Sequence, residues 1–193
     1  MTPTHLPCRA AIPTLPTLLD AFNAAPADDA RKLLLDCLRS LRWAHRVADH
    51  RPYPDIAALL AASDEAAYDL SPADLSEALA AEALPTLPDG TYSAAHTAMR
   101  AAQAAYETKF GHAFVICVDG VPPGEVLDHV LAAIRSRLTN DPEEERLVAA
   151  EELRRLAKER LGELLRGPGT ARPATTAPHP ANNRTPHPIS RKR

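Results

Sequence analysis

The stretch that decides the fold is AYETKFGHAFVICV, residues 105–118. Its first part has a helical pattern that ends at Gly111, and glycine is the residue most often found just past the last turn of a helix. Phe114 to Val118 then form a short apolar run with the propensity of a strand. A single strand would have no partner, so we interpret this run as a buried extended segment between helices.

Helical patterns flank this run on both sides. Downstream, apolar residues recur at helical spacing from about 123 to 138, and Asp-Pro at 141–142 followed by glutamates is typical of the start of a helix. Upstream, large side chains recur at spacings of three and four, which predicts a helix from about 94 to 110. These upstream side chains are His96, Met99, Gln103, Tyr106 and Phe110.

Five shorter helices are predicted before residue 94. The clearest start signal is Ser71-Pro72, a hydroxyl cap followed by proline at the first helical position. The other four are expected to begin near Leu18, Asp28, Trp43 and Pro54. The predicted fold class is therefore all-α, a single bundle of about eight helices over residues 15–166.

The two ends of the chain differ in composition from this bundle. Residues 1–14 are rich in proline and threonine, and residues 167–193 are basic, rich in proline and without acidic residues. Such segments bury too little apolar surface to offset the entropy lost on ordering. We predict a disordered N-terminal segment and a disordered basic tail. The tail is either a passive extension or a weak tether to an anionic surface.

The composition narrows the class of protein. A net charge of −3 argues against a body built to bind nucleic acid, which usually carries a basic face. No apolar run approaches the roughly 20 residues that cross a bilayer. Cys8, Cys37 and Cys117 form no CxxC pair, and we read no secretory signal. We therefore expect a soluble protein of the reducing cytosol, bound neither to nucleic acid nor to a membrane.

Three polar residues fall on helix faces that should point inward: Glu82, His96 and Arg160. An acid, an imidazole and a guanidinium are costly to bury unless they pair or face a cleft. Together they predict one polar pocket. Alternatives remain open for each: Glu82 reaches water at a helix end, and His96 is exposed in a first turn. Arg160 lies at the edge of its stripe and pairs with Glu163 or a neighbouring acid.

Motifs for a bound cofactor or metal are missing from the sequence. There is no histidine–glutamate spacing such as HExxH, no glycine-rich phosphate loop and no nucleophile elbow. We expect neither a metal nor an organic cofactor.

The order of several short blocks resembles one enzyme family. The blocks are Trp43 with RPY at 51–53, KFG at 109–111, FVIC at 114–117 and Arg137 with Asn140 and Glu145. With Arg160-Leu161 at the end, they are similar to the 2-oxo-4-hydroxy-4-carboxy-5-ureidoimidazoline (OHCU) decarboxylases of urate breakdown. The resemblance spans about Phe22 to Leu165.

This resemblance implies an activity and a site. Family members convert OHCU to (S)-allantoin and CO₂ without a metal or organic cofactor, so the implied partner is a small ureidoimidazoline substrate. Backbone groups of the FVIC block contact its ring in the family, which assigns substrate binding to Phe114, Val115, Ile116 and Cys117. The family's catalytic arginine corresponds to Arg160. Family members are commonly dimers, so the resemblance also admits a homodimer.

Two catalytic motifs of the family are altered here. Glu82-Ala83-Leu84-Pro85 stands where a His-Pro block is expected, and Ser93-Ala94-Ala95-His96-Thr97 stands where Ser-x-x-Glu-Gln is expected. Our hypothesis is a swapped pair, with His96 as general acid and Glu82 as its orienter. The alternative is a catalytically inactive or repurposed helical protein of the same fold that binds a ligand or a partner.

Overall fold

The protein is helical throughout the part of the chain that the structure describes. The computed structural model describes residues 17–83 and 93–167, and over these residues it contains α-helices, one 3₁₀ turn and no strand. The helices are α1 (Leu18–Ala24), α2 (Ala27–Cys37), α3 (Leu41–Asp49), α4 (Ile56–Tyr68), α5 (Pro72–Ala80), α6 (Ser93–Phe110), η1 (Pro123–Glu125), α7 (Val126–Arg137) and α8 (Pro142–Arg166). The predicted all-α class is confirmed, with eight α-helices in the described ranges. The segments predicted to be disordered, 1–14 and 167–193, lie outside these ranges except for Gly167.

Local start signals form the helix caps that their sequences predict. The Ser71 hydroxyl accepts from the backbone N–H of Asp74, whose carboxylate accepts in turn from the backbone N–H of Ser71, a capping box at the start of α5. At α8, the carboxylate of Asp141 accepts from the backbone N–H groups of Glu143 at 2.9 Å and Glu144 at 2.8 Å. Such caps satisfy amides that have no partner within the helix, so both boundaries follow from the sequence.

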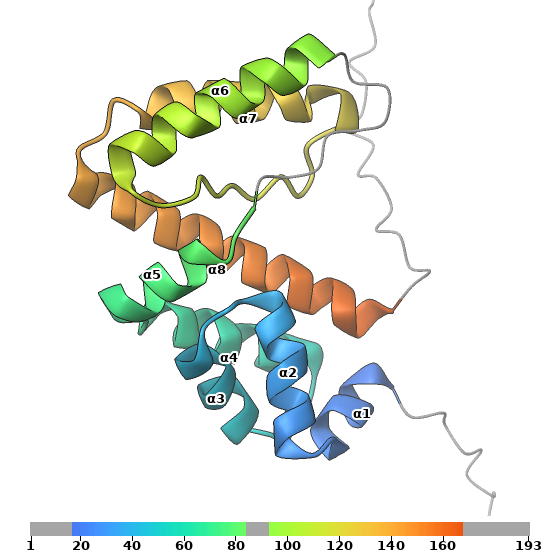
Figure 1. The fold of residues 1–193 in the computed structure, drawn as a ribbon. Coiled ribbons are helices and arrows are strands. Elements are labelled where there is room, and N and C mark those ends of the chain that lie inside the picture. Colours follow the sequence, from blue (N-terminus) through green and yellow to red (C-terminus); the bar gives the residue numbers. More distant parts are fainter. Residues whose placement is uncertain (1–16, 84–92, 168–193) are drawn as a thin grey trace, which may run out of the picture.

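Helix α8 runs through the middle of the molecule (Figure 1). Helices α1 to α5 pack on one side of it, whereas α6 and α7 form a pair on the other. The buried side chains form two clusters. One unites α1 to α5 with α8 and includes Trp43, Leu34 and Leu153. The other unites α6 with α7 and includes Met99, Tyr106 and Ile134.

The segment after α6 connects these two clusters. It begins at Gly111, whose φ of 76° suits glycine and ends the helix. Phe114 and Ile116 then pack in the α6–α7 cluster, whereas Val115 between them packs in the α8 cluster. Alternate side chains of an extended chain point to opposite sides, which explains this partition. The predicted buried extended segment is confirmed.

The Trp43 and RPY blocks stabilise the α1–α5 side. The buried indole of Trp43 donates to the carbonyl of Ser63 at 3.0 Å. The guanidinium of Arg51 donates to the carbonyls of Phe22 at 2.6 Å and Ala25 at 2.9 Å, at the end of α1. Trp43 thus joins α3 to α4, and Arg51 joins the end of α1 to the segment after α3, so this part of the family pattern is structural.

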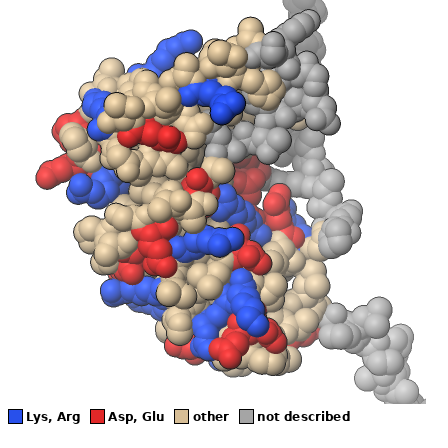
Figure 2. Space-filling view, in the orientation of Figure 1, with Lys and Arg blue, Asp and Glu red and all other residues tan. Residues whose placement is uncertain are grey.

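Surface charge is mixed on the face shown in Figure 2. Acidic and basic side chains are interspersed there, and neither sign forms a continuous patch. Within the described ranges, no helix has both the length and the hydropathy needed to cross a bilayer.

Candidate active site

Glu82 and Arg160, two of the three polar residues predicted to share a pocket, form an ion pair. Arg160 lies in α8, and Glu82 follows the end of α5. Nη1 and Nη2 of Arg160 donate to Oε1 and Oε2 of Glu82, each at 2.8 Å. The side chain of Glu82 is 5% exposed and that of Arg160 is 35% exposed. The acid is therefore buried against an arginine that itself reaches solvent.

A second contact fixes the arginine further. Nη1 of Arg160 also donates to the carbonyl of Cys37 at the end of α2, at 3.1 Å. Hydrogen bonding to Glu82 raises the pKa of Arg160, so the group keeps its charge. The alternative partner considered for Arg160, Glu163, is not the one that the structure records.

This arrangement leaves one edge of the guanidinium open. A guanidinium carries five N–H donors, and three of those of Arg160 bind Glu82 and Cys37. The remaining two, on Nε and Nη2, have no acceptor among the described residues. They lie along the same edge of the group, the arrangement that binds a carboxylate through two parallel hydrogen bonds.

The predicted substrate-contacting segment is buried next to this helix. The exposed fractions are 0% for Phe114, 2% for Val115 and 6% each for Ile116 and Cys117. The backbone N–H and C=O of Ile116 have no hydrogen-bond partner among the described residues. Buried backbone groups are nearly always paired, so an unpaired one at this place is suited to a ligand.

Two glutamates of α8 bind Cys117, and the sequence analysis did not identify either of them. The backbone N–H of Cys117 donates to Oε2 of Glu152 at 2.7 Å, and its thiol donates to Oε2 of Glu159 at 3.3 Å. The glutamates are seven positions apart, which places them on one face of α8. That spacing was the available signal. The segment therefore crosses the face of α8 that carries Glu152 and Glu159.

Burial governs the chemistry of the Cys117 thiol. Removal from water raises its pKa to about 11, with the hydrogen bond to Glu159 acting in the same direction. A thiol of that pKa is protonated near neutral pH and is a poor nucleophile.

Arg137, Asn140 and Glu145, one of the blocks of the family resemblance, form a network that positions the FVIC segment. Nε of Arg137 donates to Oε1 of Glu145 at 2.8 Å, and Nη1 donates to the carbonyl of Val115 at 2.6 Å. The hydroxyl of Tyr106 donates to the same oxygen of Glu145. The amide of Asn140 donates to the other oxygen at 2.9 Å. The guanidinium thus ties α7, α8 and the segment together.

His96 makes no contact of this kind with the ion pair of Glu82 and Arg160 in the described residues. It is the fourth residue of α6 and is exposed, which was one of the alternatives considered for it. The described residues include no hydrogen bond or ion pair between His96 and either Glu82 or Arg160. The predicted swapped pair of His96 and Glu82 is therefore not assembled by any recorded contact, and the role of His96 stays a prediction.

No group of three or more metal-ligating side chains occurs in the described ranges. The chemistry available at the ion pair is that of a fixed cation with two open donors. Such a place suits a small organic carboxylate.

Comparison with known proteins agrees with the family resemblance. The family model described as OHCU decarboxylase matches residues 23–87 and 86–162. Among curated proteins, none matches the chain.

Two solved structures share the fold. A crystal structure of (S)-allantoin synthase aligns at a TM-score of 0.61 with 22% identity, over 78% of this chain and 54% of that chain, so this protein spans about half of its length. A crystal structure of OHCU decarboxylase in the presence of (S)-allantoin aligns at 0.61 with 20% identity, over 74% of this chain and 100% of that chain. The family model covers well over half of the sequence, and the chain belongs to the OHCU decarboxylase family.

Proposed function

We propose that this protein is a cofactor-free carboxy-lyase that converts OHCU to (S)-allantoin and CO₂. The observation that carries the proposal is the open edge of Arg160. The guanidinium of Arg160 is held by the carboxylate of Glu82. The two N–H donors on its open edge match the carboxylate that the reaction removes. Membership of the family supports the same substrate class.

The proposed reaction breaks the bond between the ring carbon and its carboxylate. The electron pair of that bond passes into the conjugated ring, CO₂ leaves, and a proton is added at the same carbon. Arg160 holds the carboxylate out of the ring plane so that the breaking bond overlaps the ring π system. Glu82 fixes Arg160 in that orientation, and backbone groups at Ile116 bind the ring.

In this proposal His96 supplies the proton. Histidine is the side chain that most often acts as a general acid in enzymes. His96 is exposed in the first turn of α6, and this proposal requires substrate bound at Arg160 to come within its reach. Glu82 is then a positioning residue for Arg160 rather than for His96.

The first test replaces Arg160 with lysine. Fresh OHCU is made by urate oxidase and the hydrolase that follows it, and the circular dichroism band of (S)-allantoin reports the product. Hydrogen bonds to charged groups contribute about 1.5–3 kcal/mol, so we expect kcat/KM of Arg160→Lys to fall about 10- to 100-fold. Arg135→Lys, an exposed site on α7, is the matched control and should keep the rate. Equal rates for both variants would exclude Arg160 from the site.

The second test addresses the proton donor. Loss of a general acid lowers kcat by about 10²- to 10⁴-fold, so His96→Ala should lose most of its turnover while its fold, followed by far-ultraviolet circular dichroism, is kept. His129→Ala, an exposed histidine on α7, is the control. Undiminished decarboxylation by His96→Ala would end the assignment.

A second function is favoured by one specific observation. Protein carboxylates already occupy the backbone amide of Cys117 and two N–H donors of Arg160. A protein that only binds an anionic ligand or partner would keep such contacts without any proton donor in place. It would give OHCU decay at the spontaneous rate while still binding (S)-allantoin, which separates it from the enzyme.

A further inference from the structure

A concave surface lies along α8, and Arg160 is not among the residues that line it. It is a groove of about 580 Å³, lined by Ile56, Leu60, Cys117, Asp119, Arg154, Arg155, Lys158, Glu159, Gly162 and Arg166. Of the residues assigned above to substrate binding, only Cys117 reaches it. The volume is in the range of small-molecule sites.

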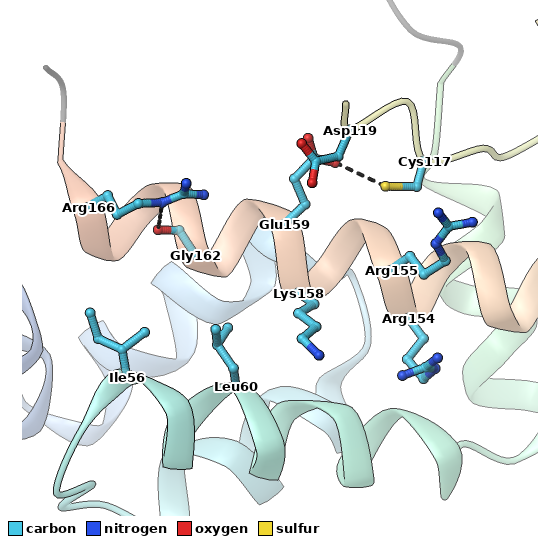
Figure 3. A pocket seen from close by; sticks show the side chains of 10 residues that line it. All are labelled: Ile56, Leu60, Cys117, Asp119, Arg154, Arg155, Lys158, Glu159, Gly162 and Arg166. Atoms are coloured by element: carbon cyan, nitrogen blue, oxygen red, sulfur yellow. Dashed lines mark hydrogen bonds between the residues drawn. The ribbon is translucent and has the colours of Figure 1, made fainter. Parts of the chain in front are cut away.

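Three elements build the groove, as Figure 3 shows. α8 forms the floor, α4 contributes Ile56 and Leu60 on one side, and Cys117 with Asp119 lies on the other side. Gly162 leaves the floor without a side chain at that point. Glycine inside a helix is unfavourable, and here it deepens the groove between Lys158 and Arg166.

The floor carries more positive than negative charge. Four cations and two carboxylates line it. Arg154 is neutralised by Asp64 and Glu151. Arg155 is half exposed and is held by Glu152 at 3.1 Å, a weak surface pair. Lys158 is exposed and has no hydrogen bond or ion pair with any described residue, which leaves a cation open to a ligand.

The wall on α4 is apolar and accessible. Ile56 is 37% exposed although it is a large hydrophobic residue, and Leu60 beside it is half-buried. A cation opposite an exposed apolar wall matches a molecule with a charged end and an apolar body. An inorganic anion would bind the cation but would leave the apolar wall without a contact.

We propose that this groove binds a small ligand with one carboxylate or phosphate group and an apolar body. The anionic group binds Lys158 and Arg155, and the apolar body packs on Ile56 and Leu60 over Gly162. The site shares Cys117 with the segment assigned to substrate binding but is lined by none of Glu82, His96 and Arg160, and its occupation does not depend on turnover.

The test is an NMR titration of the full-length chain with four probes: phenyl phosphate, benzoate, inorganic phosphate and phenol. We expect phenyl phosphate or benzoate to bind at least tenfold more tightly than inorganic phosphate and phenol, with shifts centred on the amides of residues 158–162. The better of the two identifies whether the natural group is a phosphate or a carboxylate. Equal affinity for all four probes, or shifts centred elsewhere, would overturn the proposal.

Variants assign the contacts. Lys158→Gln should weaken the better probe at least fivefold, whereas Lys32→Gln, an exposed lysine on α2, should leave it unchanged. Gly162→Leu should block the groove. Should that variant lose its helical circular dichroism, Ile56→Glu at an exposed position tests the same wall by placing a negative charge on it. The site would be refuted if the better probe bound unchanged both to Lys158→Gln and to whichever of Gly162→Leu and Ile56→Glu is folded.

Discussion

At the scale of single residues, the reactivity of the Cys117 thiol reports how well the FVIC segment is shielded from water. Burial raises its pKa to about 11, and that of Cys37 to about 11 as well. In a Cys8→Ser variant, alkylation by iodoacetamide should therefore be slow at pH 7.5 and should rise about tenfold per pH unit up to pH 10, because only the thiolate reacts.

The sign of the linked stability change follows from the same shift. An unfolded thiol titrates near 8.5, so the unfolded chain loses its thiol protons first, and the stability that burial of the neutral thiols contributes is lost as pH rises from about 8.5 toward about 11. If the rate of alkylation by iodoacetamide instead reached a plateau near pH 8.5, the FVIC segment would be open to water. A Cys117→Ser variant identifies which of the two thiols reacts.

Also at this scale, the sequence indicated the buried position of Glu82, but it indicated neither the partner of Glu82 nor the exposure of His96. Glu82 and Arg160 were placed on inward faces because both follow apolar stripes, and they do meet. Their pairing with each other, rather than through His96, depends on how α5 ends against α8. The hydrophobic pattern of either helix does not predict that contact. Glu152 was missed for the same reason, because its partner is a backbone amide 35 positions away.

At the scale of the element, α8 contains a glycine where alanine is favoured. Gly162 has ordinary helical backbone angles, and a Cβ there would meet only the end of the flexible Arg166 side chain, at 3.4 Å. Gly162→Ala should therefore raise the free energy of unfolding in urea by about 0.5–1 kcal/mol.

The matched control is Gly111→Ala. Space is open there too, but the φ of 76° disfavours any side chain, so this variant should lose about 1–2 kcal/mol. Equal changes at both positions would mean that helix propensity does not limit α8.

Most element boundaries could be predicted because their signals are local. Ser71-Pro72 and Asp141-Pro142 mark the starts of α5 and α8, and Gly111 marks the end of α6. The FVIC segment was the ambiguous case, since its composition is that of a strand. Its conformation is decided by the two clusters that receive alternate side chains, and clusters assembled from distant residues leave no local signal.

At the scale of the whole molecule, a buried ion pair joins helices of the two hydrophobic clusters. The side chain of Glu145 is 0% exposed and that of Arg137 is 9% exposed, and together they link α7, α8 and the carbonyl of Val115. Removing one partner of such a pair leaves an uncompensated buried charge, which costs about 3–5 kcal/mol.

The last prediction concerns how this cost is distributed over the fold. In Glu145→Gln, Arg137 keeps its place but loses its counter-charge, so we expect amide hydrogen exchange to accelerate in α6, α7 and the FVIC segment. Exchange around Trp43 and Leu34 should stay slow, because their cluster closes on α8 through Leu153 and does not use the ion pair. Glu163→Gln, an exposed change on the same helix, should shift the stability by less than about 0.5 kcal/mol. Uniform acceleration across both clusters in Glu145→Gln would instead mean that the molecule opens as one cooperative unit, and that the FVIC segment is held by the whole core rather than by Arg137.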